Sequence, residues 1–322
     1  MLLPIIALVI GILVLVWSAD RFVDGASGLA VRLGMPQLLI GMVIVGFGTS
    51  MPELTVSAIA SLDGDPGIAL GNAFGSNIAN IGLILGVSAL VAPVAFARSA
   101  LTREMPILTA VSLLSFWVLR DNEFSRWDAL LFFAVFALWL GHDIFRAVRG
   151  RDAAKEAEET QGAKQMPLGK SILLLAVGLA GLVASSRALV WGAVEVAGFF
   201  HVSDLVIGLT VIAVGTSLPE LASSVVAAHK GADDIALGNV IGSNIFNTLA
   251  VVGLAGAIRP IPADPVVYSR DLPVMLAMTV SLFFFGFNYR KSGDGRIGRA
   301  AAVVLLLAYV GYTVYLVRTA CA

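Results

Sequence analysis

Apolar stretches about as long as the 20 residues that a helix needs to cross a bilayer recur along the whole chain. Only 13% of the residues are charged, against roughly a quarter in a soluble domain. The stretches lack the alternation shown by the roughly 10-residue strands of outer-membrane barrels. The sequence therefore predicts an all-α integral membrane protein. Its ten predicted transmembrane helices lie at residues 2–19, 37–61, 67–91, 105–119, 128–145, 171–196, 205–228, 235–258, 272–288 and 298–317.

The chain divides at its one substantial polar segment, residues 146–170, which contains six basic and four acidic residues. We interpret residues 1–145 and 171–322 as an N-terminal and a C-terminal five-helix repeat. The segment between them is then a linker that is too short for a folded domain. The first apolar stretch has no Lys or Arg before it, so we expect a retained helix rather than a signal peptide.

The positions of Lys and Arg indicate the orientation, because cytoplasmic loops of membrane proteins carry an excess of these residues. With the N-terminus outside, 15 of the 21 Lys and Arg residues fall on the inner side. We therefore expect a multi-pass protein of the bacterial inner membrane, with both termini outside and the linker in the cytoplasm. Its surroundings are then the lipid bilayer, and no sequence feature indicates a nucleic-acid partner or an obligatory protein partner.

The second half repeats part of the first. Residues 41–86 align without a gap to residues 208–253, at an offset of 167, with 21 identities in 46 positions. The matches include two motifs, which read GTSMPE and GNAFGSNIAN in the first copy and GTSLPE and GNVIGSNIFN in the second. Because each half has an odd number of spans, the second copy is expected to be inserted upside down. This predicts two inverted repeats, the arrangement of many secondary transporters.

Each half carries one glutamate deep within a predicted span. Glu53 and Glu220 occupy equivalent positions of the repeat. An ionisable side chain at this depth costs about 2.5–3.5 kcal/mol on insertion scales, so it normally faces a cavity or a partner. The alternative is a glutamate that only holds two helices together, but the acid recurs within the same polar cluster. We interpret both glutamates as ligands of an ion.

Small polar residues and a proline accompany each glutamate. Thr49 and Thr216 lie four residues before the acids, and therefore on the same helical face. The proline that directly precedes each acid removes a backbone donor and predicts a helix break that frees carbonyl oxygens. A proline kink for packing alone would not explain the adjacent threonine and serine.

The next span of each half carries a polar stripe at a spacing of four residues. Its members are Asn72, Ser76 and Asn80 in the first half, and Asn239, Ser243 and Asn247 in the second. A hydrogen-bond ladder between helices is the alternative interpretation, above all for Asn72 and Asn239. The cluster as a whole offers hard oxygen ligands, as Ca²⁺ prefers, whereas soft transition metals prefer Cys, Met or His.

The two motif pairs resemble the alpha-repeats of the Ca²⁺/cation antiporter superfamily, specifically its prokaryotic sodium/calcium exchanger branch. The resemblance implies an antiporter, not an enzyme, which needs no cofactor and exchanges Ca²⁺ for Na⁺ by alternating access. It implies that Ca²⁺ is held by Glu53 and Glu220 with backbone oxygens of Thr49 and Thr216. The Na⁺ sites that it implies use Ser50, Ser76 and Gly46 in one repeat, and Ser217, Ser243 and Ala213 in the other.

One position departs from the family pattern. Members of this branch often carry Asp at the last position of the second motif, where this chain has Asn247, matching Asn80 in the first copy. The expected site then holds two negative charges, which one Ca²⁺, two Na⁺ or two protons would neutralise. H⁺ and K⁺ therefore stay open as alternatives to Na⁺, and the charge moved per cycle stays open too.

A cation channel and an intramembrane hydrolase are the alternatives to a carrier. A cation channel also selects ions with carboxylates, but it needs a continuous path and no counter-ion, whereas inverted repeats around one site favour a carrier. An intramembrane hydrolase needs a paired nucleophile and base, and the motifs contain neither His nor Lys.

Overall fold

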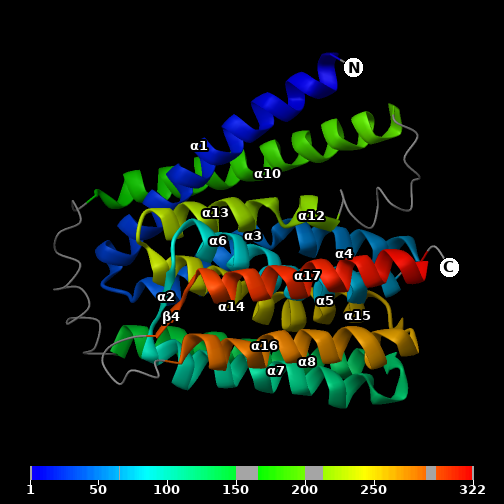
Figure 1. Ribbon diagram of the computed structural model, residues 1–322. Helices are drawn as coiled ribbons and strands as arrows, with labels where there is room; N and C mark the ends of the chain where they lie inside the picture. The colour runs from blue at the N-terminus through cyan, green and yellow to red at the C-terminus, as the bar shows by residue number, and fades with distance from the viewer. Residues whose placement is uncertain (1, 65, 150–165, 200–212, 288–294, 321–322) are drawn as a thin grey trace.

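The structure consists almost entirely of helices. It is a computed structural model that describes residues 2–64, 66–149, 166–199, 213–287 and 295–320 (Figure 1). The first half contains α1 (Leu2–Leu33), α2 (Gln37–Ile40), η1 (Gly41–Val45), α3 (Gly46–Thr49), α4 (Met51–Asp63), α5 (Gly67–Ala79), η2 (Asn80–Leu85), α6 (Gly86–Val91), β1 (Val94–Phe96), η3 (Ala100–Glu104), α7 (Met105–Val118), η4 (Leu119–Asp121), β2 (Glu123–Phe124) and α8 (Arg126–Arg149). The second half contains α10 (Leu168–Phe199), α12 (Ala213–Thr216), α13 (Leu218–His229), α14 (Asp233–Phe246), η7 (Asn247–Val251), α15 (Val252–Ile258), β3 (Ile261–Pro262), η8 (Val267–Asp271), α16 (Leu272–Gly286), β4 (Gly295–Ile297) and α17 (Arg299–Ala320).

Seven helices of the described chain are long and apolar enough to cross a membrane, and the bent pair Gln37–Thr49 and Met51–Asp63 makes an eighth. The prediction of a helical membrane protein is therefore confirmed. The helix α7 has only 14 residues of its own. Most of the predicted linker, and the start of the predicted span 205–228, lie outside the described residues. The layout with ten spans stays a prediction.

The first helix is longer than the predicted span 2–19, because α1 continues to Leu33. Charged residues lower the hydropathy after residue 19, yet the helix keeps an apolar stripe there. Phe22, Val23, Ala26 and Ala30 are almost fully buried, at helical spacing. The predicted end at residue 19 was therefore wrong, because an amphipathic helix follows the apolar stretch and continues to Leu33.

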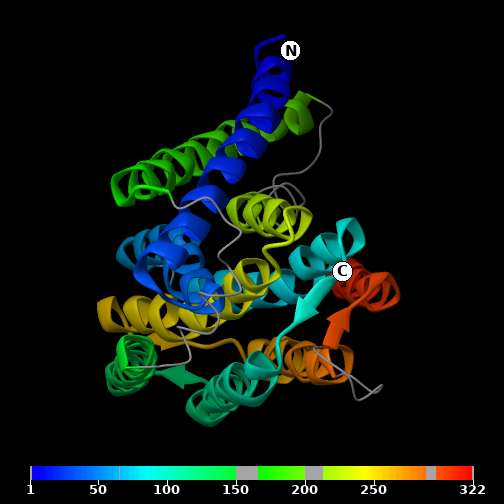
Figure 2. The same cartoon turned by 90° about the vertical axis from the view of Figure 1, so that its left-hand side faces the viewer.

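The helices form layers (Figures 1 and 2). The helices α1 and α10 pack chiefly against each other on one side of the molecule, and α7, α8 and α16 lie on the opposite side. The spans Gly67–Val91 and Asp233–Ile258 lie between these layers, with 72% and 83% of their apolar windows buried, against 33% or less for the other five long helices. The two spans that carry the motifs GNAFGSNIAN and GNVIGSNIFN are therefore enclosed by protein rather than lipid.

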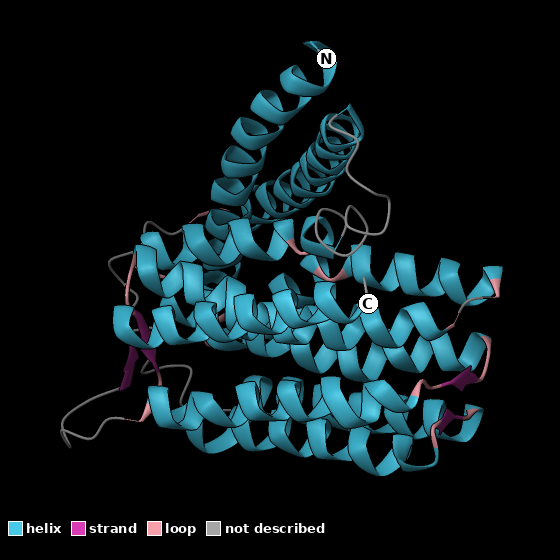
Figure 3. Ribbon diagram, turned by 45° about the vertical axis from the view of Figure 1, so that its right-hand side comes forward, coloured by secondary structure: helices cyan, strands magenta, loops and turns pink. Residues whose placement is uncertain are grey.

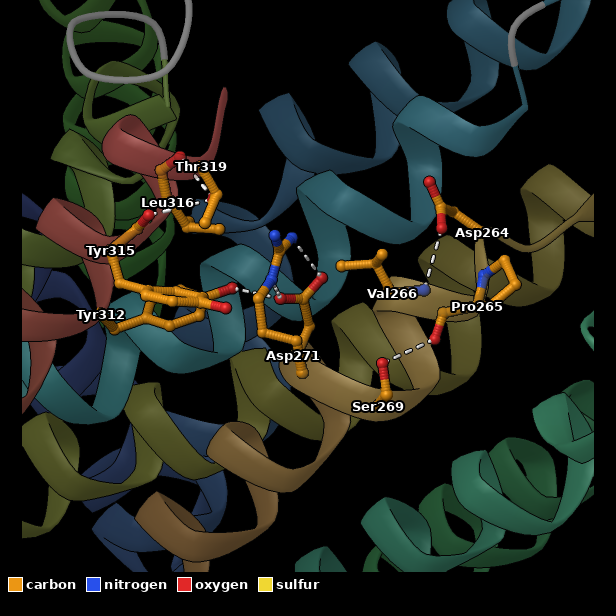
Figure 4. A network of polar contacts seen from close by, with 10 residues as sticks. Asp264, Pro265, Val266, Ser269, Asp271, Tyr312, Tyr315, Leu316 and Thr319 are labelled. Carbon is orange, nitrogen blue, oxygen red and sulfur yellow. Dashed lines mark hydrogen bonds and ion pairs between the residues drawn. The ribbon is translucent and has the colours of Figure 1, made fainter. Parts of the chain in front are cut away.

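Two short antiparallel ribbons connect the halves reciprocally. The strand β1 pairs with β4, and β2 pairs with β3, at opposite ends of the molecule (Figure 3). In the second half, Asp271 accepts hydrogen bonds from Arg270 Nε at 2.6 Å and from Tyr312 Oη at 2.8 Å (Figure 4). This contact ties α17 to the start of α16.

Candidate ion-binding site

The site is built on two interrupted helices. In the first half α3 ends at Thr49 and α4 begins at Met51, with a bend of 44° between the helical axes. The residue at the break is Ser50, with φ −82° and ψ 7°, and its repeat counterpart Ser217 has φ −89° and ψ 8°. A proline occupies the first turn after each break. The predicted helix breaks are thus confirmed, and each positions a glutamate in the first turn of the following helix.

Glu53 and Glu220 are each joined to the opposite repeat by a hydrogen bond from a serine. Ser50 Oγ donates to Glu220 Oε1 at 3.2 Å, and Ser217 Oγ donates to Glu53 Oε1 at 3.3 Å. The glutamates are only 1% and 2% exposed, and their carboxylates are close enough to repel each other. Each serine therefore serves the glutamate of the opposite repeat, so that neither half forms the site alone.

One oxygen of each carboxylate lacks a hydrogen-bond partner within the described part of the chain. Oε2 of Glu53 and Oε2 of Glu220 are buried without any hydrogen-bond donor among the described residues. Leaving a charged, buried acceptor unsatisfied costs several kcal/mol, roughly 1–3 or more per group. A cation between the two carboxylates removes that cost, because its charge offsets both the desolvation and the repulsion.

Two asparagines fix the backbone behind the carboxylates. Asn72 Nδ2 donates to the Glu53 carbonyl at 3.1 Å and to Ser57 Oγ at 2.9 Å. In the second repeat Asn239 Nδ2 donates to the Glu220 carbonyl at 3.2 Å and to Ser224 Oγ at 2.8 Å. The ladder interpretation therefore describes Asn72 and Asn239 correctly, since their amide groups hold neighbouring helices together.

The threonines and the stripe serines surround this centre. Thr49 Oγ1 lies 3.0 Å from both the carbonyl of Val45 and Asn239 Oδ1, so its one hydrogen is donated to either acceptor. The hydroxyl of Thr216 lies within hydrogen-bonding reach of Glu53. Ser243 Oγ donates to the Gly46 carbonyl at 3.4 Å, which brings these predicted ligands from opposite repeats together.

The remaining predicted ligands lie on adjoining elements. Ser76 is buried on α5, which contacts α12. Ala213 is the first described residue of α12, and its side chain lies outside the description. The helices α5 and α12 are therefore in contact, and a direct contact between Ser76 and Ala213 stays a prediction.

The two asparagines that close the stripes differ from each other. Asn80 Nδ2 donates to Asn244 Oδ1 at 2.9 Å, whereas neither amide atom of Asn247 has a partner among the described residues. Both side chains are buried. A buried amide group without a partner indicates that a cation or a water molecule binds beside it.

Sequence reasoning missed several polar residues around the site. Asn77 Nδ2 donates to Thr248 Oγ1 at 2.8 Å, and Asn244 Nδ2 donates to the Asn77 carbonyl at 3.4 Å. The asparagines of this pair are also identical in the two repeats, and that identity was the available signal.

Ser186 on α10 was missed as well. Its Oγ donates to the carbonyl of Gly215 at 2.7 Å. This carbonyl loses its helical donor because the residue four positions later, Pro219, has no backbone N–H. A single serine within an apolar helix gave no signal of this role.

Comparison with known proteins decides the family. A family model described as sodium/calcium exchanger protein matches residues 3–145 and 170–318, which is most of the chain. The chain belongs to the sodium/calcium exchanger family. The resemblance seen in the motifs is therefore confirmed, and this exchanger is a membrane transport protein rather than an enzyme.

Relatives align with the exchanger over nearly its full length. The CaxA protein of Alkalimonas amylolytica is 43% identical over 97% of this chain and 98% of its own. The inner membrane protein YrbG of Escherichia coli is 40% identical, covering 96% and 95% of the two chains. The sodium/calcium exchanger MaX1 of Methanosarcina acetivorans is 33% identical, covering 96% and 97%.

A solved structure supports the same assignment. The sodium-calcium exchanger NCX_Mj, soaked with 2.5 mM Na⁺ and 0.1 mM Ca²⁺, superposes with a TM-score of 0.81 at 30% identity. The match covers 96% of this chain and 97% of the other. Together with the apolar helices, these relatives support a multi-pass inner membrane protein.

Proposed function

We propose that this exchanger moves Ca²⁺ out of the cell in exchange for Na⁺, with Ca²⁺ held between Glu53 and Glu220. The observation that carries the proposal is the pair of buried carboxylates from opposite repeats, each with an Oε2 that has no partner among the residues the structure describes. Carboxylate, hydroxyl and amide oxygens are hard ligands, and Ca²⁺ accepts six to eight of them in flexible geometry. The described residues contain no cluster of three or more His, Cys, Asp or Glu side chains that would suit a transition metal.

Charge balance supports a bound content of two positive charges. Glu53 and Glu220 are the acidic side chains of the described site, and Asn80 and Asn247 add no charge. One Ca²⁺ or two monovalent ions neutralise them. An occupied site without net charge has the lowest free-energy cost within the membrane interior. The proposed Na⁺ sites also include Ser76 and Ala213, and support for them comes from Ser50, Ser217 and the contact of Ser243 with Gly46, which present oxygen atoms near the carboxylates.

The proposed transport cycle is alternating access between two inverted five-helix repeats, residues 1–145 and 171–322. Support comes from the crossed serine contacts, the reciprocal pairing of β1 with β4 and β2 with β3, and the two sequence segments matched by the family model. The excess of Lys and Arg on one side favours both termini outside and the linker in the cytoplasm. Such repeats form a single site near the bilayer midplane that faces each side in turn.

Radiolabelled Ca²⁺ flux into proteoliposomes tests the exchange. We expect an imposed Na⁺ gradient to drive uptake, and gradients of K⁺ or H⁺ of equal size to have little effect. Uptake driven by a pH gradient instead would make this a Ca²⁺/H⁺ antiporter, and a requirement for K⁺ together with Na⁺ would make it a K⁺-dependent one. Ca²⁺ flux that ignores all three gradients would contradict exchange and favour a channel.

A further inference from the structure

One lysine attaches α1 to the rest of the molecule. Lys230, directly after α13, contacts Asp20 Oδ1 at 2.7 Å, Asp24 Oδ1 at 2.6 Å and the Asp20 carbonyl at 3.1 Å. An ammonium group has three N–H donors, so these contacts use its full capacity. Asp20 and Asp24 are one helical turn apart on the same face of α1.

The two halves of α1 are held differently, since many residues from Ser18 onward are buried and α1 packs there on α13 as well as on α10. Between residues 2 and 17 only Pro4, Gly11 and Leu15 are buried. Pro4 and Gly11 lie against α10, at Gly192 and Leu189. The first half of α1 is thus supported mainly by α10 (Figure 2), and the Lys230 contacts add ion pairs to the packing of the second half of α1 on α13.

The packing of α1 on α10 obeys the repeat. Gly11 faces Leu189, and the residues 167 positions away, Gly178 and Phe22, face each other in the same way. The offset found in the motifs therefore extends through these helices. It allows each contact of α1 to be compared with its counterpart on α10.

Two of the three residues of the Lys230 cluster have counterparts of opposite charge in the other repeat, while Asp24 corresponds to Trp191. At the same offset, Lys230 corresponds to Asp63 at the end of α4, and Asp20 corresponds to Arg187 on α10. Both Asp63 and Arg187 are exposed, and neither forms an ion pair with any described residue. The ion pairs of Lys230 with Asp20 and Asp24 are thus formed in this structure, whereas the equivalent ion pair of Asp63 with Arg187 is not.

We propose that Asp63 and Arg187 form the second attachment when access switches, replacing the contact of Lys230 with Asp20 and Asp24. In an inverted repeat, the opposite state arises when each half adopts the arrangement that the other half has now. Arg187 then approaches Asp63 as Asp20 now approaches Lys230. The two ion pairs alternately hold the α1–α10 pair, one at each face of the membrane. These residues position the moving helices and do not touch the transported ion. The inference rests on alternating access as proposed above.

Disulfide trapping tests the open attachment directly. In a background with Cys321→Ala, the double variant Asp63→Cys and Arg187→Cys is oxidised in proteoliposomes, and its cross-linking rate is compared with that of Leu62→Cys and Arg187→Cys. Leu62 is 70% exposed and is the neighbour of Asp63 that points elsewhere on the helix. We expect the first pair to cross-link faster, and to do so about fivefold faster still when Lys230→Met removes the existing attachment, as loss of an exposed ion-pair cluster worth about 1 kcal/mol predicts.

Transport measured on the same vesicles separates this inference from the proposed function. The reduced cysteine pair should exchange Ca²⁺, the oxidised pair should not, and reduction should restore exchange. Equal cross-linking rates for the two pairs, no acceleration by Lys230→Met, or full transport in the cross-linked protein would each overturn the second attachment while leaving exchange intact. Absence of gradient-driven flux in the reduced, wild-type-like protein would instead contradict the proposed function.

Discussion

The amide of Asn239 is the most connected polar group behind the candidate site, and its removal gives a quantitative prediction. Its Nδ2 serves the Glu220 carbonyl, Ser223 Oγ and Ser224 Oγ, while its Oδ1 accepts from Thr49 and Ser243. Asn239→Ala removes these contacts at a position that is 1% exposed. Because an amide NH2 has only two hydrogens and the contact with Ser243 is long at 3.5 Å, these contacts amount to about three full hydrogen bonds. With roughly 1 kcal/mol per lost bond, we expect a loss of about 3 kcal/mol of stability.

The first repeat supplies the matched control. Asn72 occupies the equivalent position, but its side chain is only partly buried and its Nδ2 makes two contacts, to the Glu53 carbonyl and Ser57 Oγ. Because water can replace part of each bond at a partly exposed side chain, we take roughly 0.75 kcal/mol per bond, so Asn72→Ala is expected to cost about 1.5 kcal/mol, roughly half as much.

Thermal unfolding of the purified exchanger in detergent measures both variants. At roughly 2 °C per kcal/mol for a chain of this size, we expect the melting temperature to fall by about 6 °C for Asn239→Ala and about 3 °C for Asn72→Ala. Equal losses, or a larger loss for Asn72→Ala, would refute the reasoning, since the difference depends only on the contacts and burial described here.

Three further predictions concern other parts of the molecule. Tyr312→Phe removes the hydroxyl that ties α17 to Asp271 and should lower stability by about 1 kcal/mol in the same thermal assay, whereas Tyr315→Phe should not. Gly178→Val inserts a side chain into the backbone of α1, so it should slow Ca²⁺ exchange and destabilise the protein by about 1–3 kcal/mol, while Gly311→Val, which meets open space, should do neither. Asn247→Asp adds a third acidic group, so the reversal potential of exchange should shift, and an unchanged potential would remove Asn247 from the ion pathway.

The candidate site was predictable from the sequence because its parts recur in both repeats. The prolines before Glu53 and Glu220 predicted the helix breaks, and the inverted repeat together with the family resemblance predicted that the two glutamates share one site. The crossed bonds of Ser50 and Ser217 were not predictable, since they depend on how the two halves pack across the centre. The sequence therefore predicted a set of candidate residues but not which repeat each serine contacts.

Features outside the repeat motifs were harder to predict. Hydropathy ended the first helix too early because an apolar stripe, and not an apolar stretch, continues it through Phe22 and Ala26. Ser186 and Lys230 act through tertiary contacts with Gly215, Asp20 and Asp24 that have no local sequence signature. A single polar residue near a helix end is ordinary until the structure shows its partner.

Calorimetric titration of the purified protein with Ca²⁺ tests the central claim most directly. Wild-type protein is compared with Glu53→Gln and Glu220→Gln, and with Glu123→Gln as a control at an exposed glutamate on β2. The account predicts one Ca²⁺ per chain, and a loss of about 100-fold in affinity, or roughly 2.7 kcal/mol, for either site variant alone. It predicts no change for Glu123→Gln. Wild-type affinity in either Glu53→Gln or Glu220→Gln would contradict a Ca²⁺ ion held between these two carboxylates.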